Sequence, residues 1–203
     1  FPTRRSSARV GARVDKNGNV DTTTQLAAFD QGDIRGAATT DGTAFWATGV
    51  VNSDAGDTFG GVQYVVLGSP GTTTNITSVP FNTRVPGIYG GQLYMSSALT
   101  PTNGISSVGT NLPTTTGQTS TLLAGFAGDS GSPYGFSMLD LDGSVTGVDT
   151  LYVCDDRSSD GVEKWVSSGT TWSKIATFSD GTTNGCRGLF AYGRSTTVAM
   201  TTT

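Results

Sequence analysis

Histidine is absent from this 203-residue sequence, and charged residues, cysteines and long apolar runs are scarce. Charged residues make up 14% of the chain and the net charge is −4, so we expect no basic surface for a nucleic-acid backbone. No stretch approaches the roughly 18 consecutive apolar residues of a membrane-spanning helix. Two cysteines are too few for a disulfide scaffold. The sequence therefore predicts neither a nucleic-acid partner nor a membrane span.

The missing histidine decides how the hexapeptide GDSGSP at 128–133 is interpreted. It looks like the nucleophile loop of chymotrypsin-type serine proteases, with Ser130 as the nucleophile. A serine hydroxyl needs a base to take its proton, and in protease-like sites this base is a histidine. None of the three lysines, which a serine–lysine enzyme would use instead, is an obvious partner. We interpret the hexapeptide as a turn-forming loop and expect no catalytic residues, no enzymatic activity and no cofactor.

Glycine, serine and threonine are abundant instead. Glycine alone occurs 29 times, and long runs of helix-forming residues are missing, which is typical of short strands joined by turns. Four related segments begin at Arg35, Arg84, Pro133 and Arg187, at intervals of 49, 49 and 54 residues. Each complete unit contains four short runs of strand-forming residues. The sequence therefore predicts a repeat of about 50 residues with four strands per unit.

Four antiparallel strands at this period predict an all-β, β-propeller-like fold with four-stranded blades. Residues 8–203 would form one domain, with 8–26 as the last two strands of a preceding blade. The C-terminal unit supplies two strands, which gives about four blades if the ring closes, or half of a larger propeller. The alternative is a β-sandwich, which does not explain the repeat. We expect residues 1–7, FPTRRSS, to be an artefact of metagenomic type or a disordered leader, and the chain to be a fragment of a longer protein.

Several stretches carry a family resemblance: ARVDKNGNVDTTT, IRGAATTDGTAFWATG, GGQLYMSS, NLPTTTGQT, SGSPYGF and GVDTLYVCDD. Together they resemble a group of uncharacterised secreted bacterial proteins with propeller-like repeats. The resemblance covers nearly the whole chain after Ser7. It implies an extracellular or cell-surface location and a propeller-type fold, and it implies no activity.

Three arginines occupy the same place in their units, at the start of the innermost predicted strand: Arg35, Arg84 and Arg187. In a propeller this position approaches the central channel. One interpretation is a partial arginine ring that binds an anionic group. The other is that each arginine pairs with a local carboxylate such as that of Asp33, Asp155 or Asp156. These arginines are the best candidate binding site in the sequence.

Two loops have the oxygen-rich spacing that calcium prefers. The first contains Asp15, Asn17, Asn19 and Asp21, and the second contains Asp140, Asp142 and Asp149. In both, a simpler explanation is a turn, because Asn-Gly and Asp-Gly are strong turn signals. We favour plain turns and expect little effect of calcium.

Two covalent modifications are also predicted. Cys154 and Cys186 fall at the end of a second strand and before the next first strand, which places them on the same side of neighbouring blades. We favour a disulfide between them, with two unrelated buried cysteines as the alternative. Asn75 lies in an Asn-Ile-Thr glycosylation tripeptide on a predicted outer strand.

Three functions remain open from the sequence. The first is a non-enzymatic extracellular module that binds or displays an unknown ligand. The second is a structural subunit whose exposed strand edges join other copies of the chain. The third is an unrecognised hydrolase or lyase that uses carboxylates such as Asp140, Asp155 and Asp156.

Overall fold

The computed structural model describes residues 9–29, 32–51, 60–127, 131–157, 161–179, 181, 185–194 and 197–202. In this part of the chain the regular secondary structure consists of strands, without a helix. The predicted all-β class is therefore confirmed. Residues 1–7, Ser130 and part of the hexapeptide around it lie outside the described residues.

Three antiparallel sheets each contain four strands in the order in which they follow along the chain. The first sheet is β3 (Ile34–Ala38), β4 (Ala44–Gly49), β5 (Gly61–Val66) and β7 (Thr74–Thr77). The second is β8 (Pro86–Tyr89), β9 (Gln92–Ser97), β10 (Gly104–Val108) and β11 (Ser120–Leu122). The third is β12 (Pro133–Leu139), β13 (Thr150–Asp155), β14 (Gly161–Ser167) and β15 (Trp172–Phe178). These are the blade-like sheets that the sequence predicts.

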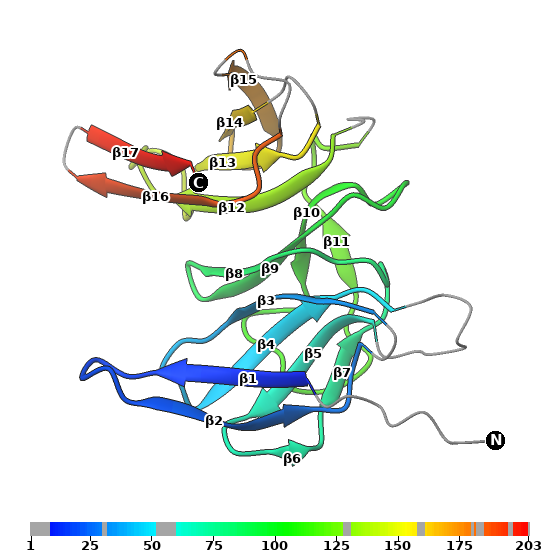
Figure 1. Ribbon diagram of the computed structural model, residues 1–203. Helices are drawn as coiled ribbons and strands as arrows, with labels where there is room; N and C mark the ends of the chain where they lie inside the picture. Colours follow the sequence, from blue (N-terminus) through cyan, green and yellow to red (C-terminus); the bar gives the residue numbers. More distant parts are fainter. Residues whose placement is uncertain are drawn as a thin grey trace.

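A hairpin lies at each end of this series. The N-terminal hairpin is β1 (Arg9–Val14) and β2 (Val20–Leu26), with the short β6 (Pro70–Gly71) parallel to β2. The C-terminal hairpin is β16 (Leu189–Arg194) and β17 (Thr197–Thr202). Figure 1 shows the N-terminal hairpin in the lower part of the molecule and the C-terminal hairpin in the upper part. Within the described residues the two hairpins do not pair, so they do not combine into one closing sheet.

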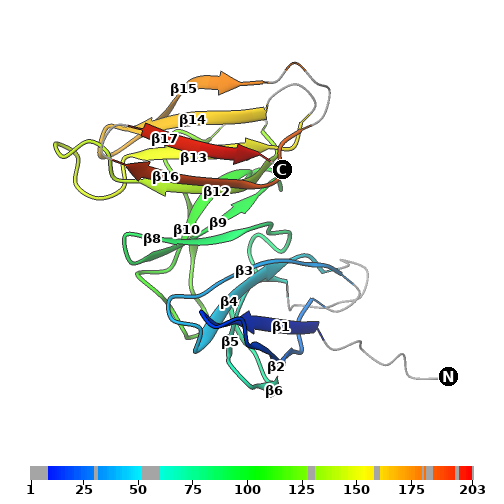
Figure 2. The same ribbon diagram turned by 60° about the vertical axis from the view of Figure 1, so that its left-hand side comes forward.

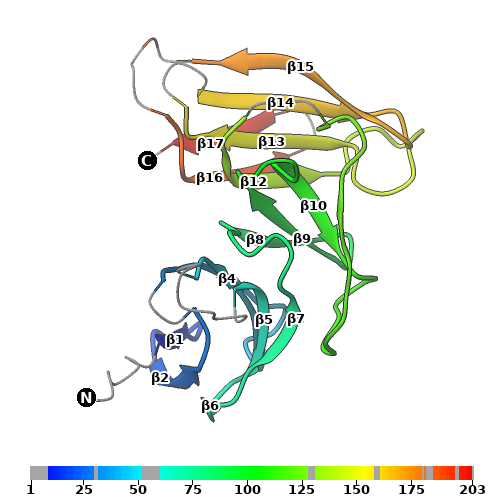
Figure 3. The ribbon, with the colours of Figure 1, turned by 90° about the vertical axis from the view of Figure 1, so that its right-hand side faces the viewer.

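Successive sheets pack on one another, in an order that Figures 2 and 3 show from two further directions. An apolar cluster fills each junction because alternate residues of a strand point to opposite faces. In β9, Leu93 and Met95 face the first sheet, whereas Tyr94 packs toward the third. In β13, Leu151 faces the second sheet and Tyr152 faces the C-terminal hairpin. Each central sheet is therefore buried on both faces.

Aromatic side chains of the central sheets belong to these junctions. Trp46, Tyr152 and Trp165 are buried, and Tyr94 is partly buried against the cluster between the second and third sheets. The indole Nε1 of Trp46 donates a hydrogen bond to the carbonyl oxygen of Pro113 at 2.7 Å. Buried indole N–H groups usually need such a partner. These rings therefore pack the core and form no exposed stacking platform.

The innermost strands of neighbouring sheets approach almost to backbone contact. A Cβ atom on Gly36 would lie 2.7 Å from Cδ of Pro86, and one on Gly135 would lie 2.6 Å from the carbonyl oxygen of Arg187. Side-chain hydroxyls also bridge the sheets, since Ser96 Oγ donates to the carbonyl oxygen of Tyr134 at 2.6 Å. This close approach brings together side chains from the start of each inner strand.

Candidate functional site

The arginines predicted from the repeat lie at or just before the start of the inner strands β3, β8 and β16. The pairing of β3 with β4 skips between Ile34 and Gly36, which leaves Arg35 at the irregularity. The pairing of β12 with β13 skips in the same way, and Tyr134 occupies this place. Arg84 lies just before β8, where its backbone N–H donates to the carbonyl oxygen of Ser96. Such irregularities often re-aim a side chain away from the sheet face.

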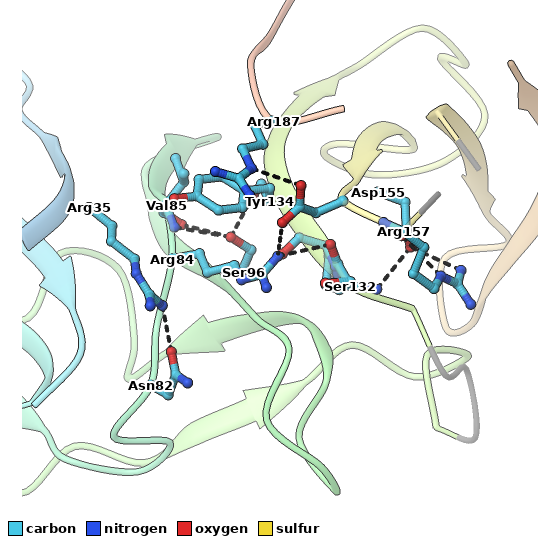
Figure 4. A network of polar contacts seen from close by, with 12 residues as sticks. Arg35, Asn82, Arg84, Val85, Ser96, Ser132, Tyr134, Asp155, Arg157 and Arg187 are labelled. Atoms are coloured by element: carbon cyan, nitrogen blue, oxygen red, sulfur yellow. Dashed lines mark hydrogen bonds and ion pairs between the residues drawn. The ribbon is translucent and has the colours of Figure 1, made fainter. Parts of the chain in front are cut away.

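Two of these arginines reach from one sheet to the segment before the first strand of the next sheet (Figure 4). The Nη1 of Arg35 donates to Oδ1 of Asn82 at 2.5 Å and lies 3.3 Å from the carbonyl oxygen of Thr83. The Nη1 of Arg84 donates to the carbonyl oxygens of Ser132 at 3.0 Å and Pro133 at 3.4 Å. Each guanidinium group thus links its own sheet to the segment that enters the next one.

Arg84 and Arg187 share an aromatic ring and a carboxylate. Their Cζ atoms lie 4.8 Å and 5.6 Å from the centre of the Tyr134 ring, a favourable distance for cation–π contact. The Nε of Arg187 donates to Oδ1 of Asp156 at 2.8 Å, and Nη1 of Arg84 lies 3.7 Å from Oδ2 of the same carboxylate. We call Arg35, Arg84, Arg187, Tyr134 and Asp156 the arginine cluster.

The electrostatics of the cluster differ between its members. Burial lowers the pKa of Arg84, and the nearby charges of Arg35 and Arg187 lower it further, while Asp156 acts in the opposite direction. The hydrogen bond to Asp156 raises the pKa of Arg187. The side chain of Arg84 is 16% exposed and that of Arg187 is 68% exposed. Arginine side chains carry a positive charge in proteins, so the cluster is a positive site that is open to solvent at Arg187.

Both interpretations of the arginines have support in this geometry. Arg84 and Arg187 do pair with Asp156, one of the carboxylates that the structural interpretation named. Arg35 instead uses the amide oxygen of Asn82. Among the described residues, Asp156 is the carboxylate that pairs with this group, and it contacts two of the three guanidinium groups.

A second charged group was not anticipated from the sequence. Asp155 is buried, and Oδ2 of its carboxylate lies 2.9 Å from Nη2 of Arg157. The same Nη2 is 3.5 Å from Oε1 of Glu163, which also accepts from Nζ of Lys174 at 2.9 Å. A cavity of about 10 Å³ beside Asp155 and Glu163 has room for about one water molecule. These acids are thus committed to buried ion pairs between strands, and the cavity beside them is far smaller than a ligand pocket.

Asp155 and Arg157 are two residues apart, but strand pairing is what brings Glu163 and Lys174 to them. Glu163 lies opposite Val153 in β13, and Lys174 lies on β15, opposite Trp165 of β14. The one signal in the sequence was that a charged residue, Glu163, stands between apolar residues of a buried strand. Such a residue generally needs a partner when it is buried.

The two calcium-like loops use their carboxylates on their own backbone. Oδ1 of Asp15 accepts from the N–H groups of Asn17 at 2.8 Å and Asn19 at 2.9 Å. The side-chain amide of Asn19 donates to Oδ2 of Asp15, and this bond is the largest cause of the lowered pKa of Asp15. Asp21 accepts from the N–H and hydroxyl of Thr23. These are the contacts of a hairpin turn.

The second loop is similar. Oδ2 of the buried Asp149 accepts from the N–H groups of Leu141 and Asp142, both at 2.8 Å. Oδ1 of Asp142 accepts from the N–H and hydroxyl of Ser144, and Asp140 is exposed. The described residues contain no group of three acidic or cysteine side chains placed to hold a metal ion.

The predicted covalent sites have distinct surroundings. A disulfide joins Cys154 to Cys186, the pair for which the sequence favoured a bridge, with a Cα–Cα distance of 4.8 Å. Asn75 lies on β7 but is only partly exposed, and its Nδ2 donates to the carbonyl oxygen of Gly60 at 3.2 Å. The amide that a glycan would modify is thus partly covered by the residue before β5, and glycosylation of Asn75 stays a prediction.

Comparisons with protein-family models, with curated proteins and with solved structures find no match to this chain. The described residues contain no helix long and apolar enough to cross a membrane.

Proposed function

We propose that the chain is a non-enzymatic, extracellular binding module of a bacterial secreted or surface protein, built from β-propeller-like blades. Its arginine cluster would bind an anionic group of an extracellular ligand. The observation that carries this proposal is the charge imbalance of the cluster, which holds three guanidinium groups and one described carboxylate, paired with Arg84 and Arg187. The disulfide supports the location, because such bonds persist mainly in oxidising compartments.

The geometry of Asp156 indicates how the ligand group would bind. Its carboxylate already bridges Arg84 and Arg187, whose guanidinium groups also lie over the Tyr134 ring. A carboxylate or phosphate of a ligand would make the same charge-assisted hydrogen bonds with the remaining N–H groups of Arg187 and Arg35. It would also offset the repulsion among the three cations, which is part of the reason for the lowered pKa of Arg84.

The test uses citrate and inorganic sulfate as probes, with sodium chloride at equal ionic strength as the reference. Arginine Nε–H resonances of the cluster should shift on titration with citrate, and those of Arg13 in β1 should not. Arg187→Gln should weaken citrate binding about tenfold, because hydrogen bonds to charged groups contribute about 1.5–3 kcal/mol. The matched control Arg13→Gln should leave it unchanged. Equal shifts at Arg13 and in the cluster would contradict the proposal.

A second candidate function is a structural subunit of an extracellular assembly, and the two ends of the molecule favour it. On β16, Phe190 is 66% and Tyr192 is 46% exposed, with ring centres 6.1 Å apart. On the N-terminal hairpin, Val14 and Val20 are each 64% exposed. The central sheets have both faces covered, whereas these apolar end faces are open to another copy of the chain.

Sedimentation velocity over a hundredfold concentration range tests this second function. An assembly through the end faces should grow with concentration, and Phe190→Ser should abolish the growth. Ile175→Ser, a control at an exposed residue of β15, should not. A monomer at every concentration would remove the assembly function and leave the anion-binding proposal intact.

A further inference from the structure

We infer that the disulfide between Cys154 and Cys186 positions Arg187 and Asp156, so that the arginine cluster is complete only in the oxidised protein. This inference rests on the proposed anion-binding function and adds a redox requirement to it. The bond is next to the cluster in sequence on both sides. Asp156 follows Cys154 by two residues, and Arg187 directly follows Cys186.

Backbone contacts around the disulfide hold these two residues in register. The N–H of Cys186 donates to the carbonyl oxygen of Asp155 at 2.8 Å. A Cβ atom on Gly185 would lie 2.3 Å from the carbonyl carbon of Asp156, so the two segments touch along their backbones. This contact places the Nε of Arg187 at 2.8 Å from Oδ1 of Asp156.

Asp156 in turn is fixed to the rest of the cluster. Its N–H donates to the carbonyl oxygen of Ser132 at 2.9 Å, and the same oxygen accepts from Nη1 of Arg84 at 3.0 Å. Arg84 and Asp156 are thus held by the second and third sheets. Arg187 is the member of the cluster that comes from the segment before β16.

That segment has few other attachments within the described residues. The apolar cluster beneath the C-terminal hairpin has four buried members, against eight at the junction between the second and third sheets. Two hydrogen bonds also attach this segment and β16 to the third sheet. Gly135 N–H donates to the Arg187 carbonyl, and Ser137 Oγ donates to the Ala191 carbonyl. Regions with few buried apolar contacts open first, and the disulfide is the covalent restraint that would keep Arg187 in place when these weaker contacts open.

Reduction would release this restraint. A dithiol such as dithiothreitol transfers two electrons and two protons to the bond, giving two thiols on the protein and a cyclic disulfide of the reagent. Arg187 would then separate from Asp156 and from the ring of Tyr134. Asp156 would then pair with Arg84 alone, and its carboxylate would neutralise the charge of Arg84 that the ligand needs.

A double-mutant cycle with citrate as the probe tests the inference. Citrate affinity is measured by calorimetry for the wild-type protein, Arg187→Gln, the double variant Cys154→Ser/Cys186→Ser, and the combination of all three substitutions. We expect Arg187→Gln and the double cysteine variant each to weaken binding about tenfold, and their combination to weaken it no further. Adding dithiothreitol to the wild-type protein should reproduce the effect of the cysteine variant.

Arg35→Gln provides the matched control, because Arg35 belongs to the first sheet and is remote from the disulfide in sequence. Its effect on affinity should be the same in the oxidised and the cysteine-free protein. Gly185→Ala, which keeps both cysteines, tests the positioning if the cysteine-free protein does not fold. Its Cβ would push residues 185–187 away from Asp156, so citrate should bind about tenfold more weakly while the disulfide stays intact.

The outcomes separate the two proposals. If Arg187→Gln and the cysteine variant multiply in their effects, or if reduction leaves citrate affinity unchanged, the positioning role of the disulfide is wrong although the arginine cluster binds anions. The same conclusion follows if Gly185→Ala binds citrate like the wild-type protein. If the oxidised wild-type protein does not bind citrate at all, the proposed function itself fails.

Discussion

Gly135→Ala is the substitution that most directly tests the close approach of the inner strands. Gly135 is buried in β12, and its N–H donates to the carbonyl oxygen of Arg187 at 3.0 Å. A Cβ atom there would lie 2.6 Å from that same oxygen and 3.1 Å from the backbone nitrogen of Leu189. Both neighbours are backbone atoms of the next inner strand, so neither can move aside alone, and the C-terminal hairpin must shift.

The magnitude follows from three contributions to the free energy of unfolding. Forcing an extra carbon into a packed site costs about 1–3 kcal/mol. Loss of the hydrogen bond between the strands costs about 0.5–1.5 kcal/mol. Alanine restricts the unfolded chain more than glycine does, which returns about 0.4–1 kcal/mol. We expect a net destabilisation of about 2–3 kcal/mol, or a fall in Tm of roughly 4–12 °C for a chain of this length.

Urea unfolding followed by tryptophan fluorescence measures this change, with Gly143→Ala as the control. A Cβ on Gly143 would meet no atom within 4 Å, so that variant should be neutral or slightly more stable. Gly135→Ala should also weaken citrate binding, because the carbonyl group that its Cβ would displace belongs to Arg187. If Gly135→Ala and Gly143→Ala unfold at the same urea concentration, the inner strands are not in contact as described here.

Four further outcomes are expected. Leu151→Ala, at a fully buried residue between the second and third sheets, should destabilise by about 2–5 kcal/mol in urea unfolding, whereas Ile175→Ala, at a residue 55% exposed, should change stability by about 0.5 kcal/mol or less. Burial opposes ionisation of Asp149, but its hydrogen bonds hold its pKa below the ordinary 3.8. As the pH drops below about 4, the unfolded chain therefore takes up the proton first, and the stability of the folded protein should fall. Asp149→Asn should flatten this pH dependence in a pH series of unfolding curves. Millimolar calcium should leave Tm nearly unchanged, since a site occupied at a hundredfold excess over Kd would add about 2.7 kcal/mol, a rise of many degrees. A fluorophosphonate probe should not label Ser130, and labelling detected by mass spectrometry would overturn the loop interpretation.

The sequence determined the strands because their signals are local. Short runs of strand-forming residues such as LYMSS in β9 and TLYVCD in β13, separated by Gly- and Asp-rich turns, contain the information for four-stranded meanders without any distant contact. The repeat of about 50 residues also predicted that Arg35 and Arg84 occupy equivalent places in two successive sheets. The turn at Asp15 was also predictable, because Asn-Gly between two alternating runs favours a hairpin by itself.

Only the tertiary structure decided which side chains meet across sheets. Arg84 could have paired with any of several acids, and it lies near Asp156 because glycines let the inner strands approach closely. Asp155 was unavailable to the cluster because Arg157 occupies it. The partial burial of Asn75 and the separation of the two terminal hairpins also depend on how whole sheets pack. Packing between sheets joins residues about fifty positions apart, and no local pattern in the sequence specifies the distance between them.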